Sequence, residues 1–254
     1  MTIKAVAWDI DGTLIDSEPL HHRALVVGTL EFGVDLSDLP ESAFRGVHML
    51  DVWAAVRPRL PADTNERQWL DAIHTHYAAA TRTLAPIAGA VQATAEIASL
   101  GLIQVCVSNS DRLIVDANVA ALGIADRLAF TLALNDVGHG KPDPEPYLTA
   151  AAKLGLVSHE VIAVEDSITG AQAARAAGMT VVGYHSERVP FADLDHVVAD
   201  HSELVAIIKQ RLRTQGHQPL RHYLEPQAGS RLPFGKARLR KGYTGPDSSS
   251  KEMT

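Results

Sequence analysis

The chain has 254 residues with 46% hydrophobic content, enough for one large or two modest domains, and its single cysteine excludes an intramolecular disulfide and a metal site built from a cluster of cysteines. Residues 1–210 hold 14 basic and 27 acidic side chains, a net charge of −13 that argues against a nucleic-acid surface, whereas residues 211–254 have a net charge of +6. No run reaches the ~18 apolar residues of a membrane helix and the chain start lacks a signal-peptide pattern, so we expect no membrane association and a cytoplasmic protein.

The first predicted element is a buried strand over residues 3–8, which is mostly apolar and ends in two acids, Asp9 and Asp11. Alternate residues of an extended segment point to the same face, so we expect the two carboxylates to share one pocket. Like charges held together need a cation, a proton or hydrogen bonds to offset their repulsion. The pair therefore predicts a metal site or an acid–base role, and Gly12 allows a sharp turn directly after it.

Residues 16–86 interrupt the alternation of strands and helices. The spacing of apolar residues predicts helices over residues 19–30, 50–56 and 65–80. Residues 84–89 contain proline and glycine and read as a linker. We therefore expect an α-helical cap domain inserted after the first strand.

After residue 86 the alternation resumes and predicts an α/β fold. We expect helices over residues 90–100, 112–122, 145–154 and 168–177, and strands over residues 103–107, 129–134, 161–164, 180–182 and 196–199. Repeated strand–helix units imply a doubly wound, Rossmann-like parallel sheet, built here from residues 1–15 and 87–212. Ligands of such sheets bind outside the carboxyl ends of the strands, where Asp9, Ser108 and Glu165-Asp166 fall.

Four short segments together resemble the motifs of the haloacid dehalogenase superfamily. They are Asp9-x-Asp11-Gly12-Thr13, Ser108-Asn109, Gly140-Lys141-Pro142 and Glu165-Asp166-Ser167, in this order and each in a fitting context. The position of the helical insertion is similar to that in the phosphatase and β-phosphoglucomutase-like branch. The resemblance covers about residues 1–211.

The resemblance implies a Mg²⁺-dependent phosphatase acting on a small phosphorylated metabolite of the sugar phosphate or phosphoglycolate type. Asp9 would be the nucleophile that forms an aspartyl phosphate, and Asp11 the general acid and base. Ser108 and the main-chain N–H of Asn109 would bind the phosphoryl oxygens, and Lys141 would neutralise charge on the phosphoryl group and on Asp9. Mg²⁺ would be held by Asp9, the main-chain carbonyl of Asp11, Asp166 and, directly or through water, Glu165. Lys141 alone cannot offset four carboxylates and a phosphate dianion, which independently favours a divalent cation.

Residues of the cap are expected to decide the substrate. By position, His21 and the segment Arg45-Gly46-Val47-His48 would face the active site. In the mutase branch an arginine that binds the distal phosphate follows this segment, and the aligned residue here is Met49. A thioether cannot bind a phosphate dianion, so we favour hydrolysis over a β-phosphoglucomutase-type transfer, which stays the alternative.

Two further expectations concern the whole chain. A catalytically idle binding or scaffold protein is the second alternative, because a fold does not by itself imply an activity. Residues 213–254 are rich in Gln, Gly, Pro, Ser and basic residues without periodic apolar positions, so we expect a basic tail with little order. The expected partner is a small phosphorylated substrate, with no nucleic acid and no membrane.

Overall fold

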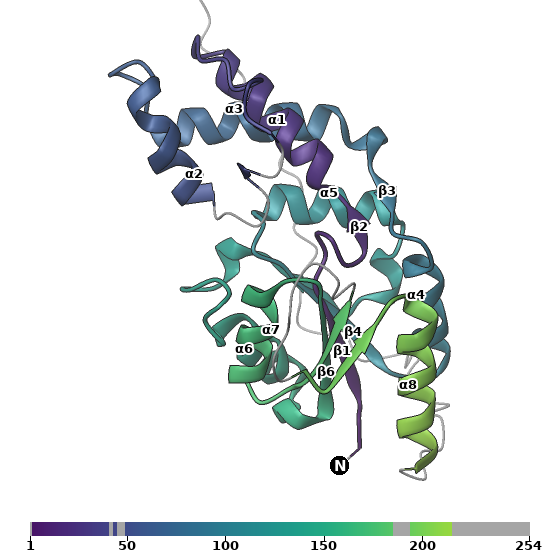
Figure 1. Ribbon diagram of the computed structural model, residues 1–254. Helices are drawn as coiled ribbons and strands as arrows, with labels where there is room; N and C mark the ends of the chain where they lie inside the picture. Colours follow the sequence, from purple (N-terminus) through teal and green to yellow (C-terminus); the bar gives the residue numbers. More distant parts are fainter. Residues whose placement is uncertain (1, 41–42, 45–48, 185–193, 215–254) are drawn as a thin grey trace, which may run out of the picture. The chain divides into compact units, whose positions relative to one another are not determined.

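The computed structural model describes residues 2–40, 43–44, 49–184 and 194–214 (Figure 1). All of them belong to the first of the two units into which the chain divides, Met1–Leu220, and Arg221–Thr254 lie outside the described residues. The centre of the first unit is a six-stranded sheet with the order β5-β4-β1-β6-β7-β8, and all neighbouring strands are parallel. Its strands are β1 (Ala5–Trp8), β4 (Ile103–Val107), β5 (Phe130–Leu132), β6 (Val161–Glu165), β7 (Thr180–Tyr184) and β8 (His196–Val198).

Helices cover both faces of the sheet, as Figure 1 shows. One face packs against α4 (Ala90–Ser99), α5 (Arg112–Leu122) and α8 (His201–Thr214), the other against α6 (Glu145–Leu154) and α7 (Ile168–Ala176). Strand β1 is apolar throughout because both of its faces are buried. Val6 and Trp8 belong to the apolar core on one face of the sheet, and Ala5 and Ala7 belong to the core on the other face. The doubly wound parallel sheet expected from the sequence is thus confirmed.

A helical segment is inserted between β1 and α4. It contains α1 (Glu18–Leu30), α2 (Met49–Val56) and α3 (Glu66–Ala79), which share an apolar core of their own. Helices α1 and α3 approach closely at Gly28, where a Cβ atom would come within 2.9 Å of the Ile73 backbone. The chain leaves and returns through a short antiparallel ribbon formed by β2 (Ile15–Asp16) and β3 (Ala85–Pro86).

The largest differences between the structure and the expected elements are in three places. The linker predicted at residues 84–89 contains β3, which is part of the ribbon. A strand of two residues is too short to be predicted from the periodicity of its side chains. Strand β5 is shorter than expected because Leu134–Asp136 form a 3₁₀ turn. Helix α8 was not predicted, and it extends through residues 213 and 214, which we had assigned to the tail. The rest of that tail lies outside the described residues.

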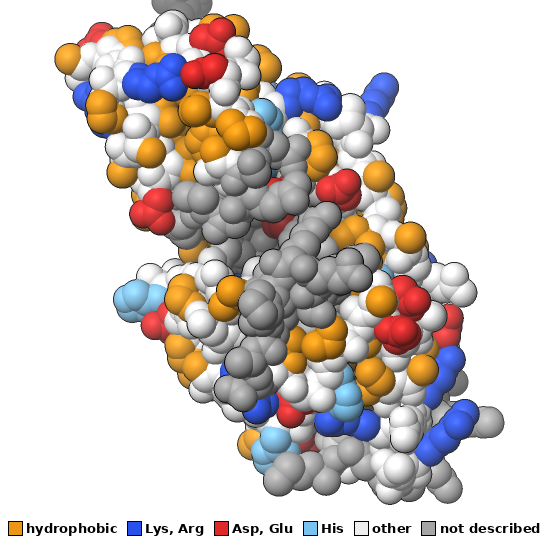
Figure 2. Space-filling view, viewed as in Figure 1, with side chains coloured by type: hydrophobic (Ala, Val, Ile, Leu, Met, Phe, Trp, Pro, Cys, Tyr) orange, Lys and Arg blue, Asp and Glu red, His pale blue; other side chains and the backbone are white. Residues whose placement is uncertain are grey.

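Short 3₁₀ turns also occur at Arg57–Arg59, Thr81–Thr83, Ala125–Arg127 and Ser158–Glu160. Within the described ranges, no helix combines the length and apolar character that crossing a membrane requires. On the face drawn in Figure 2, hydrophobic side chains are interspersed with acidic and basic ones. The large exposed apolar residues include Val27, Leu30 and Leu50 of the inserted helices.

Candidate active site

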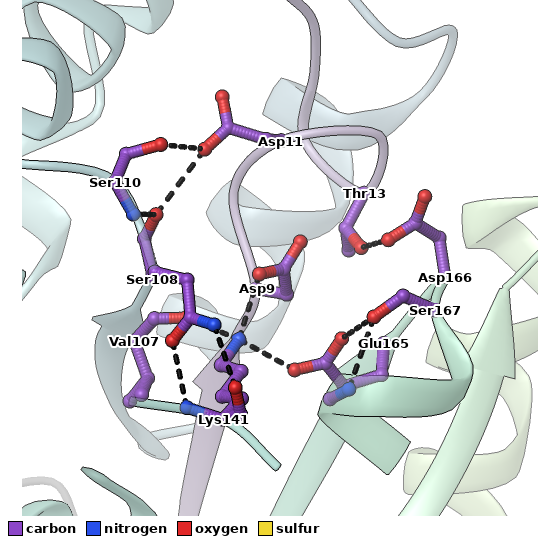
Figure 3. Close-up of polar contacts among 12 residues, drawn as sticks. Asp9, Asp11, Thr13, Val107, Ser108, Ser110, Lys141, Glu165, Asp166 and Ser167 are labelled. Carbon is purple, nitrogen blue, oxygen red and sulfur yellow. Dashed lines mark hydrogen bonds and ion pairs between the residues drawn. The ribbon is translucent and has the colours of Figure 1, made fainter. Parts of the chain in front are cut away.

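Three neighbouring strands bring their polar residues together at one edge of the sheet. Asp9 directly follows β1, Ser108 follows β4, and Glu165 is the last residue of β6, with Asp166 after it. Because β1 lies between β4 and β6 and all three are parallel, their carboxyl ends meet. Figure 3 shows these side chains converging.

Lys141 lies at the centre of this group and is buried, with 6% of its surface exposed. Its Nζ donates hydrogen bonds to Asp9 Oδ1 at 2.7 Å, to Glu165 Oε1 at 2.6 Å and to the Val107 carbonyl oxygen at 2.8 Å (Figure 3). The three donors of an ammonium group thus all have acceptors. A buried cation needs such partners, and the two carboxylates supply its counter-charge.

Asn109 fixes the loop that carries Lys141. Its Nδ2 donates to the Lys141 carbonyl oxygen at 2.9 Å, and the Lys141 N–H donates to its Oδ1 at 2.8 Å. Gly140 is needed beside this pair, because a Cβ atom there would lie 2.9 Å from the Asn109 Oδ1. We had expected the main-chain N–H of Asn109 to bind phosphate; the position of its side chain adds a structural role that the sequence did not indicate.

Glu165 is fully buried and has several partners. Besides Lys141, it accepts a short hydrogen bond from the Tyr147 hydroxyl and one from Ser167 Oγ at 3.3 Å. Gly170 leaves room for it, since a Cβ atom there would lie 2.0 Å from Glu165 Oε2. We did not predict from the sequence that Tyr147 contacts the site, because an aromatic residue on the apolar side of a helix is usually part of the hydrophobic core.

The residues around Lys141 include more buried carboxylates than positive charges. Burial raises the pKa of Asp9 well above its usual range, Lys141 opposes this, and the carboxylates of Glu165 and Asp166 add to it. Burial and the neighbouring Glu165 raise the pKa of Asp166 to about 7. Burial alone would lower the pKa of Lys141, but Asp9 and Glu165 outweigh it and raise that pKa.

These carboxylates fit a divalent cation. Oxygen atoms of Asp9, Glu165 and Asp166 lie within 4.8 Å of one another, and hard oxygen donors suit Mg²⁺. Since Glu165 already accepts hydrogen bonds from Lys141, Tyr147 and Ser167, the two aspartates are the freer ligands. Gly12 makes room for Asp166, because a Cβ atom at residue 12 would lie 2.1 Å from its Oδ2.

Asp11 has a different set of partners from Asp9. Strand β1 ends at Trp8, so the alternation that we extended to residue 11 stops before it. Oδ2 of Asp11 accepts hydrogen bonds from Ser110 Oγ at 2.9 Å and Ser108 Oγ at 3.2 Å (Figure 3). Nothing in the spacing of the sequence indicated that the two acids would have separate partners.

The second oxygen of Asp11 contacts the inserted helices and α5. Oδ1 accepts from Ser17 Oγ at 2.5 Å and from Asn118 Nδ2 at 2.9 Å, and His21 Nε2 lies 3.3 Å away. Burial would raise the pKa of Asp11, but the His21 hydrogen bond and charge, together with the serine hydroxyls, outweigh it and lower that pKa. Ser17 precedes α1 without capping it, so its hydroxyl is available to Asp11.

The structure thus brings together Asp9, Lys141, Glu165 and Asp166 around one point, and Asp11 with Ser108 beside it. Of the cap residues expected at the site, His21 contacts Asp11. Arg45, Gly46, Val47 and His48 lie outside the described residues. Ser110, Asn118 and Tyr147 were not predicted; Asn118 has a signal in the sequence, a single polar residue on the apolar stripe of α5.

Comparison with known proteins agrees with this arrangement. The sequence model of the haloacid dehalogenase-like hydrolases matches residues 3–178. Hexitol phosphatase B of Escherichia coli (strain K12) is 32% identical over 182 residues, which cover 70% of this chain and 81% of that protein. Phosphoglycolate phosphatase of Pectobacterium atrosepticum is 28% identical over 225 residues, covering 81% and 92% of the two chains.

A third relative is longer, and one solved structure illustrates the fold. The chain is 30% identical to Protein SUPPRESSOR OF QUENCHING 1, chloroplastic, of Arabidopsis thaliana over 71% of its own length, but spans only 18% of that protein. The crystal structure of CbbY from Rhodobacter sphaeroides in complex with phosphate superposes with a TM-score of 0.71 at 24% identity, covering 80% of this chain and 96% of CbbY. At that identity the likeness shows the fold.

Proposed function

The chain belongs to the haloacid dehalogenase-like hydrolases, and we propose that it is a Mg²⁺-dependent phosphatase that hydrolyses a small phosphorylated metabolite. The observation that carries the proposal is the contact of Lys141 Nζ with Asp9 Oδ1 at 2.7 Å, beside the oxygens of Glu165 and Asp166. It brings together a carboxylate suited to act as the nucleophile, a cation and two carboxylates suited to hold a metal, at the carboxyl ends of neighbouring strands. The phosphatases among the relatives support a substrate of the sugar phosphate or phosphoglycolate type.

Each side chain has a chemical role in the proposal. A carboxylate oxygen of Asp9 attacks the phosphorus atom, the P–O bond of the ester breaks, and Asp11, in its protonated form, gives its proton to the departing alcohol oxygen. Because its hydrogen bonds lower the pKa of Asp11 and favour the ionised form, Asp11 must take up this proton before the step. Water then attacks the phosphorus of the aspartyl phosphate, Asp11 takes a proton from it, and phosphate leaves Asp9. Lys141 offsets negative charge on the nucleophile and the phosphoryl group, and Ser108 donates its hydroxyl to a phosphoryl oxygen.

Bound Mg²⁺, held by Asp9, Asp166 and the main-chain carbonyl of Asp11, would neutralise charge on the phosphoryl oxygens. The raised pKa values of Asp9 and Asp166 support this assignment, since they mark a site where buried carboxylates exceed the available positive charge. Glu165 would act mainly by holding Lys141, at 2.6 Å, rather than as a direct ligand.

The mutase alternative lacks a favouring observation among the described residues. Met49, at the position where the mutase branch carries its phosphate-binding arginine, begins α2 and packs against the apolar core of the inserted helices. The idle-scaffold alternative is opposed by the intact set of Asp9, Lys141 and Asp166.

The test is phosphate release from a panel of phosphorylated metabolites, including β-glucose 1-phosphate with its bisphosphate, in the presence of Mg²⁺. We expect hydrolysis of at least one sugar phosphate or phosphoglycolate, its loss on chelation of the metal, and its loss in Asp9→Asn with an unchanged thermal transition. Isomerised sugar phosphate in place of inorganic phosphate would identify a mutase. Full activity in Asp9→Asn would reject the nucleophile.

A further inference from the structure

A continuous chain of hydrogen bonds links an inserted helix to Asp11. The hydroxyl of Tyr77, on α3, donates to Asn118 Oδ1 at 2.6 Å. The Nδ2 of Asn118, on α5, donates to Asp11 Oδ1 at 2.9 Å. Tyr77 and Asn118 are both fully buried, so no solvent competes for these bonds.

Asn118 occupies a position where packing alone would favour an apolar side chain. On α5 it shares its buried face with Ile114, Val115, Val119 and Leu122. Burying an amide costs free energy unless its groups are hydrogen-bonded, and here the carbonyl end is paired with Tyr77 and the amino end with Asp11. The pairing fixes which way the amide faces, since only its NH₂ group can donate to a carboxylate.

The two oxygens of Asp11 are held differently. Oδ2 receives the hydroxyls of Ser108 and Ser110, and Ser108 is the residue that would turn to a phosphoryl oxygen when substrate binds. Oδ1 is held from the opposite side by Asn118, Ser17 and His21, none of which has a role on the phosphoryl group. Anchoring Oδ1 leaves Oδ2 as the oxygen that faces the phosphate side.

Tyr77 also limits the movement of this anchor. Its ring packs against the His21 ring, with centroids 4.6 Å apart, while its hydroxyl holds Asn118. A single residue of α3 thus orients two of the groups that contact Asp11 Oδ1.

We propose that Asn118, oriented by Tyr77, is a positioning residue that holds the Asp11 carboxylate for proton transfer to the leaving group. The inference rests on the proposed function, in which Asp11 protonates the departing alcohol. Catalysis by a positioned acid depends on alignment, and a misplacement of about 1 Å can cost on the order of 10²-fold in rate. The hydrogen bonds of the Asn118 side chain join it to Tyr77 and Asp11 and to none of the other residues assigned to the metal or the phosphoryl group, so we expect it to affect the proton transfer.

The test compares two leaving groups. Removing Asn118 alone would leave the buried Tyr77 hydroxyl without its acceptor, so the variant is the double substitution Tyr77→Phe with Asn118→Leu, which removes both partners. The substrates are 2,4-dinitrophenyl phosphate, whose leaving group departs without a proton, and the alkyl phosphate of the metabolite panel that the wild type hydrolyses fastest.

For the double variant we expect kcat/KM on the alkyl phosphate to fall about tenfold or more, and kcat/KM on dinitrophenyl phosphate to change less than about twofold. The KM for the alkyl phosphate should stay near the wild-type value, because the pair contacts no part of the substrate. Equal losses on both substrates, or no loss on either, would reject the positioning role.

A matched control separates positioning from packing. Trp69 Nε1 donates to Thr29 Oγ1 at 2.9 Å, a buried hydrogen bond between α3 and α1 that does not reach Asp11. Thr29→Val removes it, and should lower the thermal transition while leaving the ratio of the two kcat/KM values unchanged. If the wild type itself shows no Asp9-dependent turnover of dinitrophenyl phosphate, the proposed function fails and the inference fails with it.

Discussion

The ammonium group of Lys141 lies 2.7 Å from a carboxylate oxygen of Asp9, although 132 residues separate the two in the chain. The same ammonium lies 2.6 Å from Glu165, which is fully buried. The lysine is therefore part of the stability of the sheet edge as well as of its chemistry.

Lys141→Met should abolish phosphatase activity and also destabilise the fold. It leaves Glu165 as a buried charge without its cation, a change that typically costs about 3–5 kcal/mol. Chemical denaturation measures the loss. The double variant Lys141→Met with Glu165→Gln removes the lysine charge and the Glu165 charge but leaves the Asp9 carboxylate, so it should recover part of the stability while staying inactive. Recovery of activity would contradict the role of Lys141.

Mg²⁺ should stabilise the protein more at high pH than at low pH. The pKa of Asp166 is raised from 3.8 to about 7, so the folded state binds this proton more tightly than the unfolded chain. Without metal, the stabilisation that comes from protonated Asp166 in the folded state is present below pH 4 and is lost as the pH rises towards 7. Mg²⁺ needs the ionised carboxylate, so its binding should weaken as the pH falls below 7.

The measurement is the shift in thermal transition on adding Mg²⁺, taken at about pH 8 and about pH 5.5. We expect a clear upward shift at the higher pH and a small one at the lower. Asp166→Asn is the control and should show little shift at either pH. A wild-type shift of the same size at both values would mean that Asp166 is not the group whose ionisation limits binding.

Gly12→Ala should be inactive because it blocks the position of Asp166. The added Cβ would lie 2.1 Å from Asp166 Oδ2, and the backbone φ of +84° is itself unfavourable for alanine. Gly33→Ala is a matched control, since φ there is +77° and nothing lies within 4 Å of the added atom. It should cost only the backbone strain, about 1–3 kcal/mol, and retain wild-type kcat. Similar activity in the two variants would exclude the steric explanation.

Tyr147→Phe should lower stability far more than activity. It removes only the hydroxyl that donates to Glu165, which keeps Lys141 and Ser167 as partners. Hydrogen bonds to charged groups contribute about 1.5–3 kcal/mol. Denaturant unfolding and steady-state kinetics on one sample measure both quantities; an unchanged free energy of unfolding would show that this hydrogen bond contributes nothing to stability.

Much of the site was predictable because it depends on local rules. An apolar strand followed by acids, repeated along an α/β chain, places those acids at one edge of the sheet, and Asp9, Ser108 and Glu165 all lie there. Lys141 was predicted from its motif, and its Nζ lies 2.7 Å from Asp9 Oδ1, while its role at the phosphoryl group stays a prediction. The shared pocket of Asp9 and Asp11 was predicted by extending the strand alternation to Asp11, three residues past the end of β1.

What the sequence alone determined is the fold class, the order of its elements and the residue types at the strand ends, because periodicity, turns and chain direction are properties of neighbouring residues. What only the tertiary structure decided is which partner each polar group obtains. Tyr77, Asn118 and Asp11 form one hydrogen-bonded chain although they come from three separate segments. These hydrogen bonds depend on how helices pack across the interface between the inserted segment and the sheet core. The spacing of residues along the chain does not determine that packing.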